Sequence, residues 1–201
     1  MRKFLATLLA LVMTLALMVP ASWGENKETY QLPDSLEGKT VILHTNDVHG
    51  AIDKYAKVAA LRDECYDKGA HQVILLDAGD FSQGSPYVSL SKGATALDMM
   101  ALVGYDVITL GNHTWGKMQI TDYLEENRYI LRPANFSPRT PGRGYGVYDL
   151  GRVQVAVMVL IGRCDLAWGS DNPFTTADRL LKAGDKPTFT LVDFHAQAKS
   201  E

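Results

Sequence analysis

Cysteine and basic charge are both scarce in this sequence of 201 residues. The two cysteines, Cys65 and Cys164, are too few for a disulfide scaffold and lack the spacing of metal ligands. They either pair after export or remain two buried thiols, and the sequence leaves both alternatives open. The formal net charge of −3 provides no basic field to hold a nucleic-acid backbone, so we expect no polymeric nucleic acid as a ligand.

Two further patterns are absent from the sequence. It contains no Gly-x-Ser-x-Gly motif, so the turn that carries the nucleophile of many serine hydrolases is not expected. Ser82 and Ser85 are therefore interpreted as loop residues. No internal repeat is visible, and 201 residues, 46% of them hydrophobic, suit one globular domain with a single core.

The first residues have the pattern of a targeting segment. Arg2 and Lys3 give a positive start, and residues 4–18 are free of charge. Small residues allow cleavage after Ala21 or Gly24, so we expect a signal peptide over residues 1–24 and an exported protein, periplasmic, cell-surface or secreted. The alternative is an uncleaved membrane anchor, because about 20 apolar residues span a bilayer and this run is only slightly shorter.

Beyond a polar linker at residues 25–39, short β-branched runs alternate with segments of helical periodicity. This alternation predicts an α/β fold with parallel strands joined by crossover helices. A long loop rich in proline and glycine is expected at residues 133–146. The strands are expected at 40–44, 72–76, 106–110, 153–161 and 188–193, and the helices at 54–68, 95–103, 118–126 and 177–182.

Three predicted strands end in loops that carry candidate metal ligands. Asp47 and His49 stand in TNDVHG, Asp80 in DAGDFSQG, and Asn112 and His113 in TLGNHTW. Ligands of open α/β sheets gather at the carboxyl ends of the strands, so these loops should meet at one edge. Carboxylate, imidazole and amide oxygen together suit a divalent metal ion, whereas an iron–sulfur or blue-copper site would require thiolates.

These motifs carry a resemblance to a known family. ILHTNDVHG, LLDAGDFSQGSP and DVITLGNH resemble the calcineurin-like metallophosphoesterases, above all secreted bacterial 5'-nucleotidases and 2',3'-cyclic-nucleotide phosphodiesterases. From Thr114 onward, LRPANF, TPGRGY, DNPFTTAD and VDFHAQAKSE resemble bacterial calcineurin-like cyclic-nucleotide phosphodiesterases. The resemblance covers residues 40–201 and implies a metallophosphoesterase catalytic domain with a four-layer α/β/β/α sandwich.

The resemblance also implies a role for each matching residue. Asp47 and His49 would bind a first metal ion, Asp80 would bridge two ions, Asn112 and His195 would bind the second, and His113 would be the catalytic histidine. Two divalent ions, Mn²⁺, Zn²⁺ or Fe²⁺, would activate the attacking water, so no serine or cysteine nucleophile is required. The implied substrate is a small-molecule nucleotide phosphomonoester or cyclic phosphodiester.

Several other polar and aromatic residues are better explained by structure than by function. His44 and His71 do not fit the ligand pattern and are interpreted as structural or surface groups. Loop arginines are usually solvated, although they can also hold a substrate phosphate, and aromatic residues near the site either line a base pocket or pack in the core. These residues are Arg132, Arg139, Arg143, Arg163, Trp115 and Tyr145.

The sequence departs from the family pattern at two places. The family usually has an Asp three residues after the catalytic histidine, and this sequence has Gly116 there; loss of such an orienting partner commonly costs about 10 to 100-fold in activity or affinity. The family pattern also has a Gly-x-His-x-His type segment downstream of the position of His195, and the sequence up to Glu201 does not contain it. The resemblance therefore implies a sandwich incomplete at its carboxyl end and leaves an alternative: a truncated, catalytically impaired protein that binds divalent metal weakly.

Overall fold

The computed structural model describes residues 31–114, 130–131, 134–135, 144–149, 154–163, 170–183 and 187–196, without the side chains of 130 and 131. Contacts divide the chain into residues 1–33 and 34–201, and every described helix and strand belongs to the second unit. The expected signal peptide, the expected helix at 118–126 and most of the expected loop at 133–146 lie outside the described residues.

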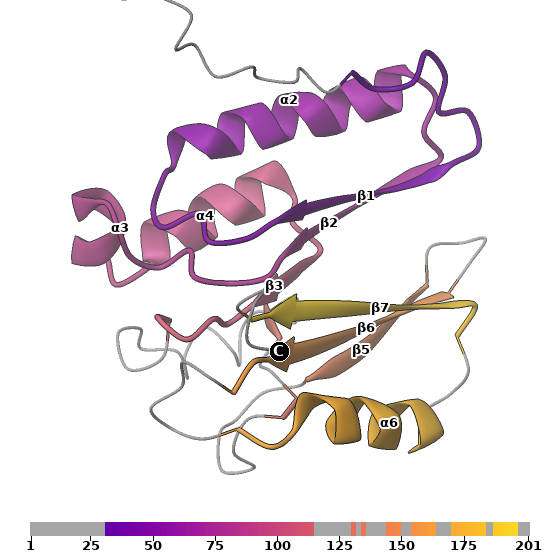
Figure 1. Cartoon of the computed structure of the whole chain (residues 1–201). Coiled ribbons are helices and arrows are strands. Elements are labelled where there is room, and N and C mark those ends of the chain that lie inside the picture. Colours follow the sequence, from indigo (N-terminus) through magenta and orange to yellow (C-terminus); the bar gives the residue numbers. More distant parts are fainter. Residues whose placement is uncertain are drawn as a thin grey trace, which may run out of the picture. The chain divides into compact units, whose positions relative to one another are not determined.

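The first sheet contains four parallel strands in the order β1-β2-β3-β4 (Figure 1). Its strands are β1 (Thr40–Thr45), β2 (Gln72–Asp77), β3 (Val107–Thr109) and β4 (Ile130–Leu131). β2 pairs with β1 along its whole length and is buried from Val73 onward, as expected for an apolar strand in the interior of a parallel sheet. The prediction of parallel strands joined by crossovers is confirmed for this sheet.

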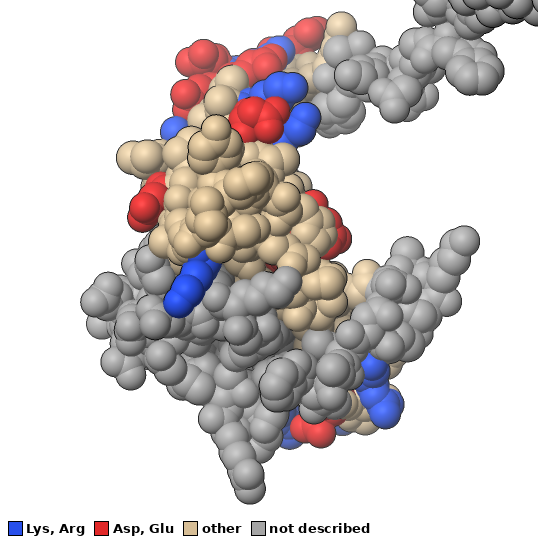
Figure 2. Space-filling view, turned by 90° about the vertical axis from the view of Figure 1, so that its left-hand side faces the viewer, with Lys and Arg blue, Asp and Glu red and all other residues tan. Residues whose placement is uncertain are grey.

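The connections between the strands of the first sheet contain three helices, one between β1 and β2 and two between β2 and β3. They are α2 (Asp53–Asp67), α3 (Pro86–Leu90) and α4 (Ala94–Val103). Side chains of α2 and α4 form a buried cluster with alternate residues of β2 and β3, among them Tyr55, Leu97, Leu75 and Ile108. Figure 2 shows basic and acidic side chains side by side at the top of the view, above a broad surface of uncharged residues, which fits the solvated outer side of the charged helix α2.

The short helix α3 was not expected from the sequence, which predicted a loop as far as Pro86. The Ser85 hydroxyl accepts a hydrogen bond from the Val88 backbone N–H, and Pro86 occupies the first helical position. Both features favour a helix start, because the serine satisfies a free N–H group and the proline ring presets the backbone angle. Five residues are too few to show helical periodicity, so the pattern alone did not reveal this helix.

The second sheet contains β5 (Tyr145–Asp149), β6 (Gln154–Ile161) and β7 (Phe189–His195) in that order. β5 runs antiparallel to β6, whereas β7 runs parallel to it. We expected a loop at residues 133–146, but its last two residues, Tyr145 and Gly146, belong to β5. The predicted end of the loop was therefore wrong. β5 is an edge strand with half-buried and exposed side chains, and β4 has only two residues, so neither carries the apolar run from which a strand is predicted.

The two sheets pack face to face, and α6 (Pro173–Ala183) packs on β6. The contact between the sheets is a buried cluster of Ile74, Leu76 and Val107 from the first sheet with Val155, Val157 and Val159 from the second. Figure 1 shows the resulting succession of helices, sheet, sheet and helix. This arrangement confirms the predicted α/β/β/α sandwich.

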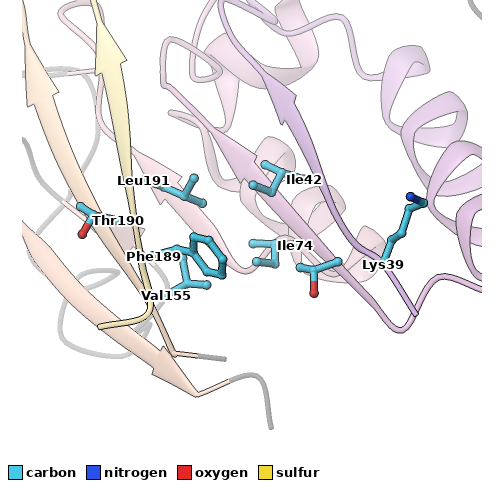
Figure 3. A pocket seen from close by; sticks show the side chains of 8 residues that line it. Lys39, Ile42, Ile74, Val155, Phe189, Thr190 and Leu191 are labelled. Atoms are coloured by element: carbon cyan, nitrogen blue, oxygen red, sulfur yellow. The ribbon is translucent and has the colours of Figure 1, made fainter. Parts of the chain in front are cut away.

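An apolar groove of about 510 Å³ separates the sheets at the amino ends of the strands (Figure 3). Ile42 and Ile74 line it from the first sheet, and Val155, Phe189 and Leu191 line it from the second. Ile42 and Phe189 are 46% and 58% exposed, so the close contact between the sheets weakens toward this end. No helix among the described residues is long and apolar enough to span a membrane.

A fully buried carboxyl group ends β2. Asp77 is 0% exposed; its Oδ2 accepts a hydrogen bond from Thr45 Oγ1 at 2.6 Å, and its Oδ1 accepts one from the Gly79 N–H at 2.9 Å. Burial raises the pKa of Asp77 to about 7, although both hydrogen bonds favour the charged form. Below about pH 7 the folded protein therefore keeps a proton on Asp77 that the unfolded chain releases near pH 4.

We predict that Asp77→Asn reduces the loss of stability that accompanies a rise from about pH 4 to about pH 7. In this window the folded state binds more protons than the unfolded state, so the free energy of unfolding falls as the pH rises. Asparagine has the shape of the protonated acid and releases no proton. Urea unfolding at pH 5 and pH 8, both with chelator, measures the difference; Asp178→Asn on the exposed face of α6 is the matched control. An unchanged decline in Asp77→Asn would contradict the raised pKa.

Candidate metal centre

The loop residues that follow β1 and β2 have an unusual backbone conformation. Asp47, His49 and Asp80 have φ angles of 53°, 46° and 59°, in the left-handed region that residues other than glycine rarely adopt. Such a conformation costs on the order of 1–3 kcal/mol per residue and is retained where surrounding structure imposes it. Backbone hydrogen bonds from Asp47 N to Gly79 O at 3.1 Å and from His49 N to Asp80 O at 3.0 Å hold the two loops together.

Glycine at position 79 allows the loops after β2 and β3 to approach each other. Gly79 has a φ of 110°, and a Cβ atom built there would collide with the backbone of Gly111. A Cβ at Gly111 would in turn collide with the Asp80 carboxylate. Only the absence of both side chains lets the Asp80 carboxylate lie against the third loop, where its Oδ1 accepts a hydrogen bond from the His113 N–H at 2.8 Å.

Side chains from both sheets meet at this edge. Ligand atoms of Asp47, Asp80 and His195 lie within 4.8 Å of one another. His195 is the last residue of β7; its Nε2 lies 3.3 Å from Asp80 Oδ2 and 2.8 Å from Asn112 Oδ1. The second sheet thus delivers its imidazole to the loops of the first sheet, although about 150 residues separate Asp47 from His195 in sequence.

Asp80 and His195 stabilise each other in their charged forms. Burial raises the pKa of Asp80, but the His195 ring and the His113 N–H outweigh this effect and the pKa falls below its usual range. For His195, burial lowers the pKa, yet the Asp80 carboxylate and the nearby charge of Asp47 raise it above its ordinary value. Asp80, only 1% exposed, is therefore a buried anion at the centre of the cluster, where a cation is favoured.

His49 and His113 lie on the open side of the cluster. His49 Nε2 is 3.2 Å from Asp47 Oδ1, and both side chains are well exposed, at 39% and 48%. The rings of His49 and His113 are 5.8 Å apart at an interplanar angle of 67°. The structure thus brings all six predicted site residues to one edge, with Asp80 and His195 buried and His49 and His113 facing the open side.

Asn46 belongs to this cluster and was not singled out from the sequence. Its Nδ2 donates to Asp47 Oδ2 at 2.6 Å, and its Oδ1 lies 3.3 Å from His195 Nδ1. Asn46 therefore holds the ring nitrogen of His195 that faces away from Asp80. Its place directly before Asp47 in the TNDVHG motif was the one signal available in the sequence, because its partner comes from the other sheet.

The donor atoms of this cluster fit divalent metal ions. Two carboxylates, an imidazole and an amide oxygen form a set of hard and borderline ligands suitable for Mn²⁺, Fe²⁺ or Zn²⁺. Asp47, Asp80 and His195 are close enough to serve one ion, and the Asn112 amide oxygen lies beside the His195 ring. Three protein ligands would leave positions open for water or substrate, as catalytic metal sites require.

The remaining predicted residues are not in the group of possible metal ligands or lie outside the described residues. His44 Nε2 lies 2.9 Å from Asp193 Oδ1, and His44 is therefore engaged outside the cluster. His71 is exposed beside the start of β2 and does not join the cluster either. Cys65 is a buried free thiol. Ser85 caps α3, and Ser82 is buried at 2% exposed. Tyr145 lies on β5, and Arg163 follows β6. Six further residues lie outside the part of the chain that the structure describes: Trp115, Gly116, Arg132, Arg139, Arg143 and Cys164.

The four-layer sandwich, with its cluster of Asp, Asn and His side chains at the strand ends, defines a calcineurin-like metallophosphoesterase fold. A solved structure with this fold is the 5'-nucleotidase precursor from Thermus thermophilus, which aligns with a TM-score of 0.60 and 24% identity over 77% of this chain and 36% of its own. Within this class, the chain belongs to the YmdB-like protein family, whose model matches residues 88–201, more than half of the sequence.

Two curated relatives have nucleotide-related names. A 2',3'-cyclic-nucleotide 2'-phosphodiesterase of Bacillus subtilis is 41% identical over 113 residues, which cover 55% of this chain and 42% of the relative. A 5'-nucleotidase of Rattus norvegicus is 30% identical over 133 residues, or 54% of this chain and 22% of the relative. The chain thus spans less than half the length of either relative. The family match begins at residue 88, well before the change of resemblance expected at Thr114.

We predict that Asp80→Asn weakens Mn²⁺ binding by more than the roughly 10 to 100-fold that loss of a supporting partner costs. The amide keeps the shape of the side chain and its bond from the His113 N–H, but it removes the central negative charge. Isothermal titration of the chelator-treated chain with MnCl₂ gives the dissociation constant. Asp178→Asn, an exposed carboxylate on α6, should bind Mn²⁺ as the unmodified chain does. Equal affinity in all three proteins would place the ion elsewhere.

Proposed function

We propose that this chain is an exported, metal-dependent phosphoesterase that hydrolyses nucleotide phosphomonoesters or cyclic phosphodiesters through a binuclear site. The observation that carries the proposal is the convergence of Asp47, Asp80 and His195 from two separate sheets, with ligand atoms within 4.8 Å. Such a cluster lies at the carboxyl ends of the strands, where α/β sheets hold their ligands. The names of the two relatives, a cyclic-nucleotide phosphodiesterase and a 5'-nucleotidase, support the substrate class.

Each polar residue has a distinct task in this reaction. When bound, a pair of divalent ions activates a water molecule and neutralises charge on the phosphate group. Asp80 would hold the ions at the centre of the site; its Oδ2 lies 3.3 Å from His195 Nε2, and its Oδ1 is fixed by the hydrogen bond from the His113 N–H. Asn46 keeps the His195 ring in place through Nδ1, which leaves Nε2 directed at Asp80 and Asn112.

His113 is the residue we assign to the leaving group. It follows the buried β3 strand and its exposed ring lies on the open side of the cluster, beside His49. From that side an imidazole can donate a proton to the leaving oxygen or stabilise its developing charge. The backbone of His113 is fixed to Asp80, so the acid and the metal-binding carboxylate are held in one geometry.

A second candidate function is divalent metal binding with impaired catalysis. Gly116 stands where the family resemblance implies an Asp that orients the catalytic histidine. Among the described residues, a single group of three Asp and His side chains is close enough to share one ion, and His49 lies outside it. A site with full affinity for one ion and low affinity for a second would bind metal and turn substrate over slowly.

We predict Mn²⁺-dependent hydrolysis that requires Asp80. The purified chain is loaded with MnCl₂ and assayed with p-nitrophenyl phosphate as monoester, bis-p-nitrophenyl phosphate as diester, and with AMP and 2',3'-cyclic AMP. Chelator and Asp80→Ala should each abolish turnover, because both remove the charge that activates water. Asp178→Ala is the control and should retain the rate. His113→Gln should lower the rate by about 10² to 10⁴-fold while leaving Mn²⁺ affinity unchanged, as expected for a general acid.

The outcomes separate the two candidates. Turnover above background that is lost in Asp80→Ala supports the phosphoesterase, and the ratio of the two chromogenic rates identifies the ester type. Mn²⁺ binding without turnover of any of the four substrates supports the metal-binding candidate. Turnover that survives both chelator and Asp80→Ala would refute the assigned site.

Export yields a separate prediction. Arg2, Lys3 and the uncharged run at residues 4–18 have the pattern of a cleaved signal peptide. When the full chain is expressed in a bacterium, the protein outside the cytoplasm should begin at residue 22 or 25, as measured by mass spectrometry of the intact protein. A membrane-bound product that retains Met1 would instead identify an uncleaved anchor.

A further inference from the structure

A buried carboxylate on β7 joins the second sheet to two strands of the first. Asp193 is 3% exposed and stands two residues before His195, so both side chains lie on the same face of β7. Its Oδ2 accepts a hydrogen bond from Thr109 Oγ1 at 2.7 Å, and its Oδ1 lies 2.9 Å from His44 Nε2. Both partners belong to the opposite sheet, so these bonds cross between the layers.

The two partners of Asp193 precede loops of the candidate site. Thr109 is the last residue of β3 and is followed closely by Asn112, while His44 lies in β1 just before Asp47. β2 lies between β1 and β3 in the sheet, so one carboxylate is bonded to the strands on both sides of it. Asp193 therefore connects the three strands that lead to Asp47, Asn112 and His195.

Packing between the sheets does not by itself determine where His195 lies. The cluster that joins the sheets consists of valine, isoleucine and leucine side chains, and apolar contact is not directional. Within its own sheet, His195 is fixed along β6 by the bond from Gly162 N to His195 O at 2.8 Å. That bond moves with the second sheet and cannot set its position against the first.

Hydrogen bonds to a buried carboxylate can set that position. They are short and directional, and a buried charge that loses its partners is costly, so arrangements that break them are strongly disfavoured. We propose that Asp193 is a positioning residue that fixes the second sheet against the first and so holds the His195 ring among the metal ligands. The part of this inference that concerns metal affinity rests on the proposed function.

Replacement of the Thr109 hydroxyl gives the sharpest test. Thr109→Val keeps the shape of the side chain and removes only the donor to Asp193. The matched control is Thr190→Val, the same change at an exposed position of β7 near the groove. Thr109→Ser restores the hydroxyl and should restore the wild-type behaviour. Asp193→Asn removes the negative charge from the other side of the bond.

Two measurements are made on the full chain. In chelator-treated protein labelled with ¹⁵N-histidine, the ring resonances of His195, assigned with His195→Gln, report its hydrogen bonds to Asn46 and Asn112. We expect them to shift in Thr109→Val and Asp193→Asn but not in Thr190→Val or Thr109→Ser. Titration with MnCl₂ should show affinity about 10-fold lower in the same two variants, the lower end of the range for supporting residues.

The two readouts fail independently. If the unmodified chain binds no Mn²⁺ but the His195 resonances shift as expected, the metal site is wrong and the positioning role of Asp193 stands. If the resonances and the Mn²⁺ affinity of Thr109→Val match those of Thr190→Val, Asp193 does not position His195 and the proposal is overturned. Should Asp193→Asn fail to fold, the comparison of Thr109→Val with Thr109→Ser decides the question.

Discussion

The candidate site depends on the contact between two sheets that share no strand pairing among the described residues. Asp47, Asp80 and Asn112 follow strands of the first sheet, whereas His195 ends a strand of the second. The faces are joined by a small apolar cluster in which Ile74 and Leu76 of β2 meet Val157 and Val159 of β6. Ile74 and Val155 of this cluster also line the apolar groove, so the contact loosens toward the amino ends of the strands and the geometry of the site is decided nearer their carboxyl ends.

Polar groups replace apolar ones along the same interface as it nears the site. Asp77 at the end of β2 and Asp193 on β7 are both buried. Asp77 accepts a hydrogen bond from Thr45 at the end of the adjacent strand β1, and Asp193 accepts one from Thr109 at the end of β3 in the opposite sheet. Burying carboxyl groups is costly, and their charges repel, which contributes to the raised pKa of Asp77. These buried carboxyl groups lie close in sequence to the candidate site, where Asp47 and Asp80 have left-handed backbone angles. Costly burial and backbone strain both occur at functional sites.

Much of this arrangement was predictable from the sequence, because the longer strands are uninterrupted apolar runs. The expected bounds of the strands at 40–44, 72–76 and 153–161 differ from β1, β2 and β6 by at most one residue at each end. Interactions that decide short or edge elements were not visible: the Ser85 cap of α3 is a local hydrogen bond, and β5 needs β6 as a partner. The roles of Asn46 and Asp193 could not be read from the sequence either, because their hydrogen-bond partners lie on the opposite sheet.

The division of ligands between the sheets links metal binding to folding. A cation held by Asp80 from one sheet and His195 from the other would strengthen the contact between the layers, since a ligand that binds only the folded state stabilises it. The converse also follows: any loosening of the sheets separates His195 from Asp80 before it disturbs Asp47, which is tied to Gly79 through the backbone. Affinity for an ion held by both Asp80 and His195 should therefore be sensitive to the integrity of the sandwich.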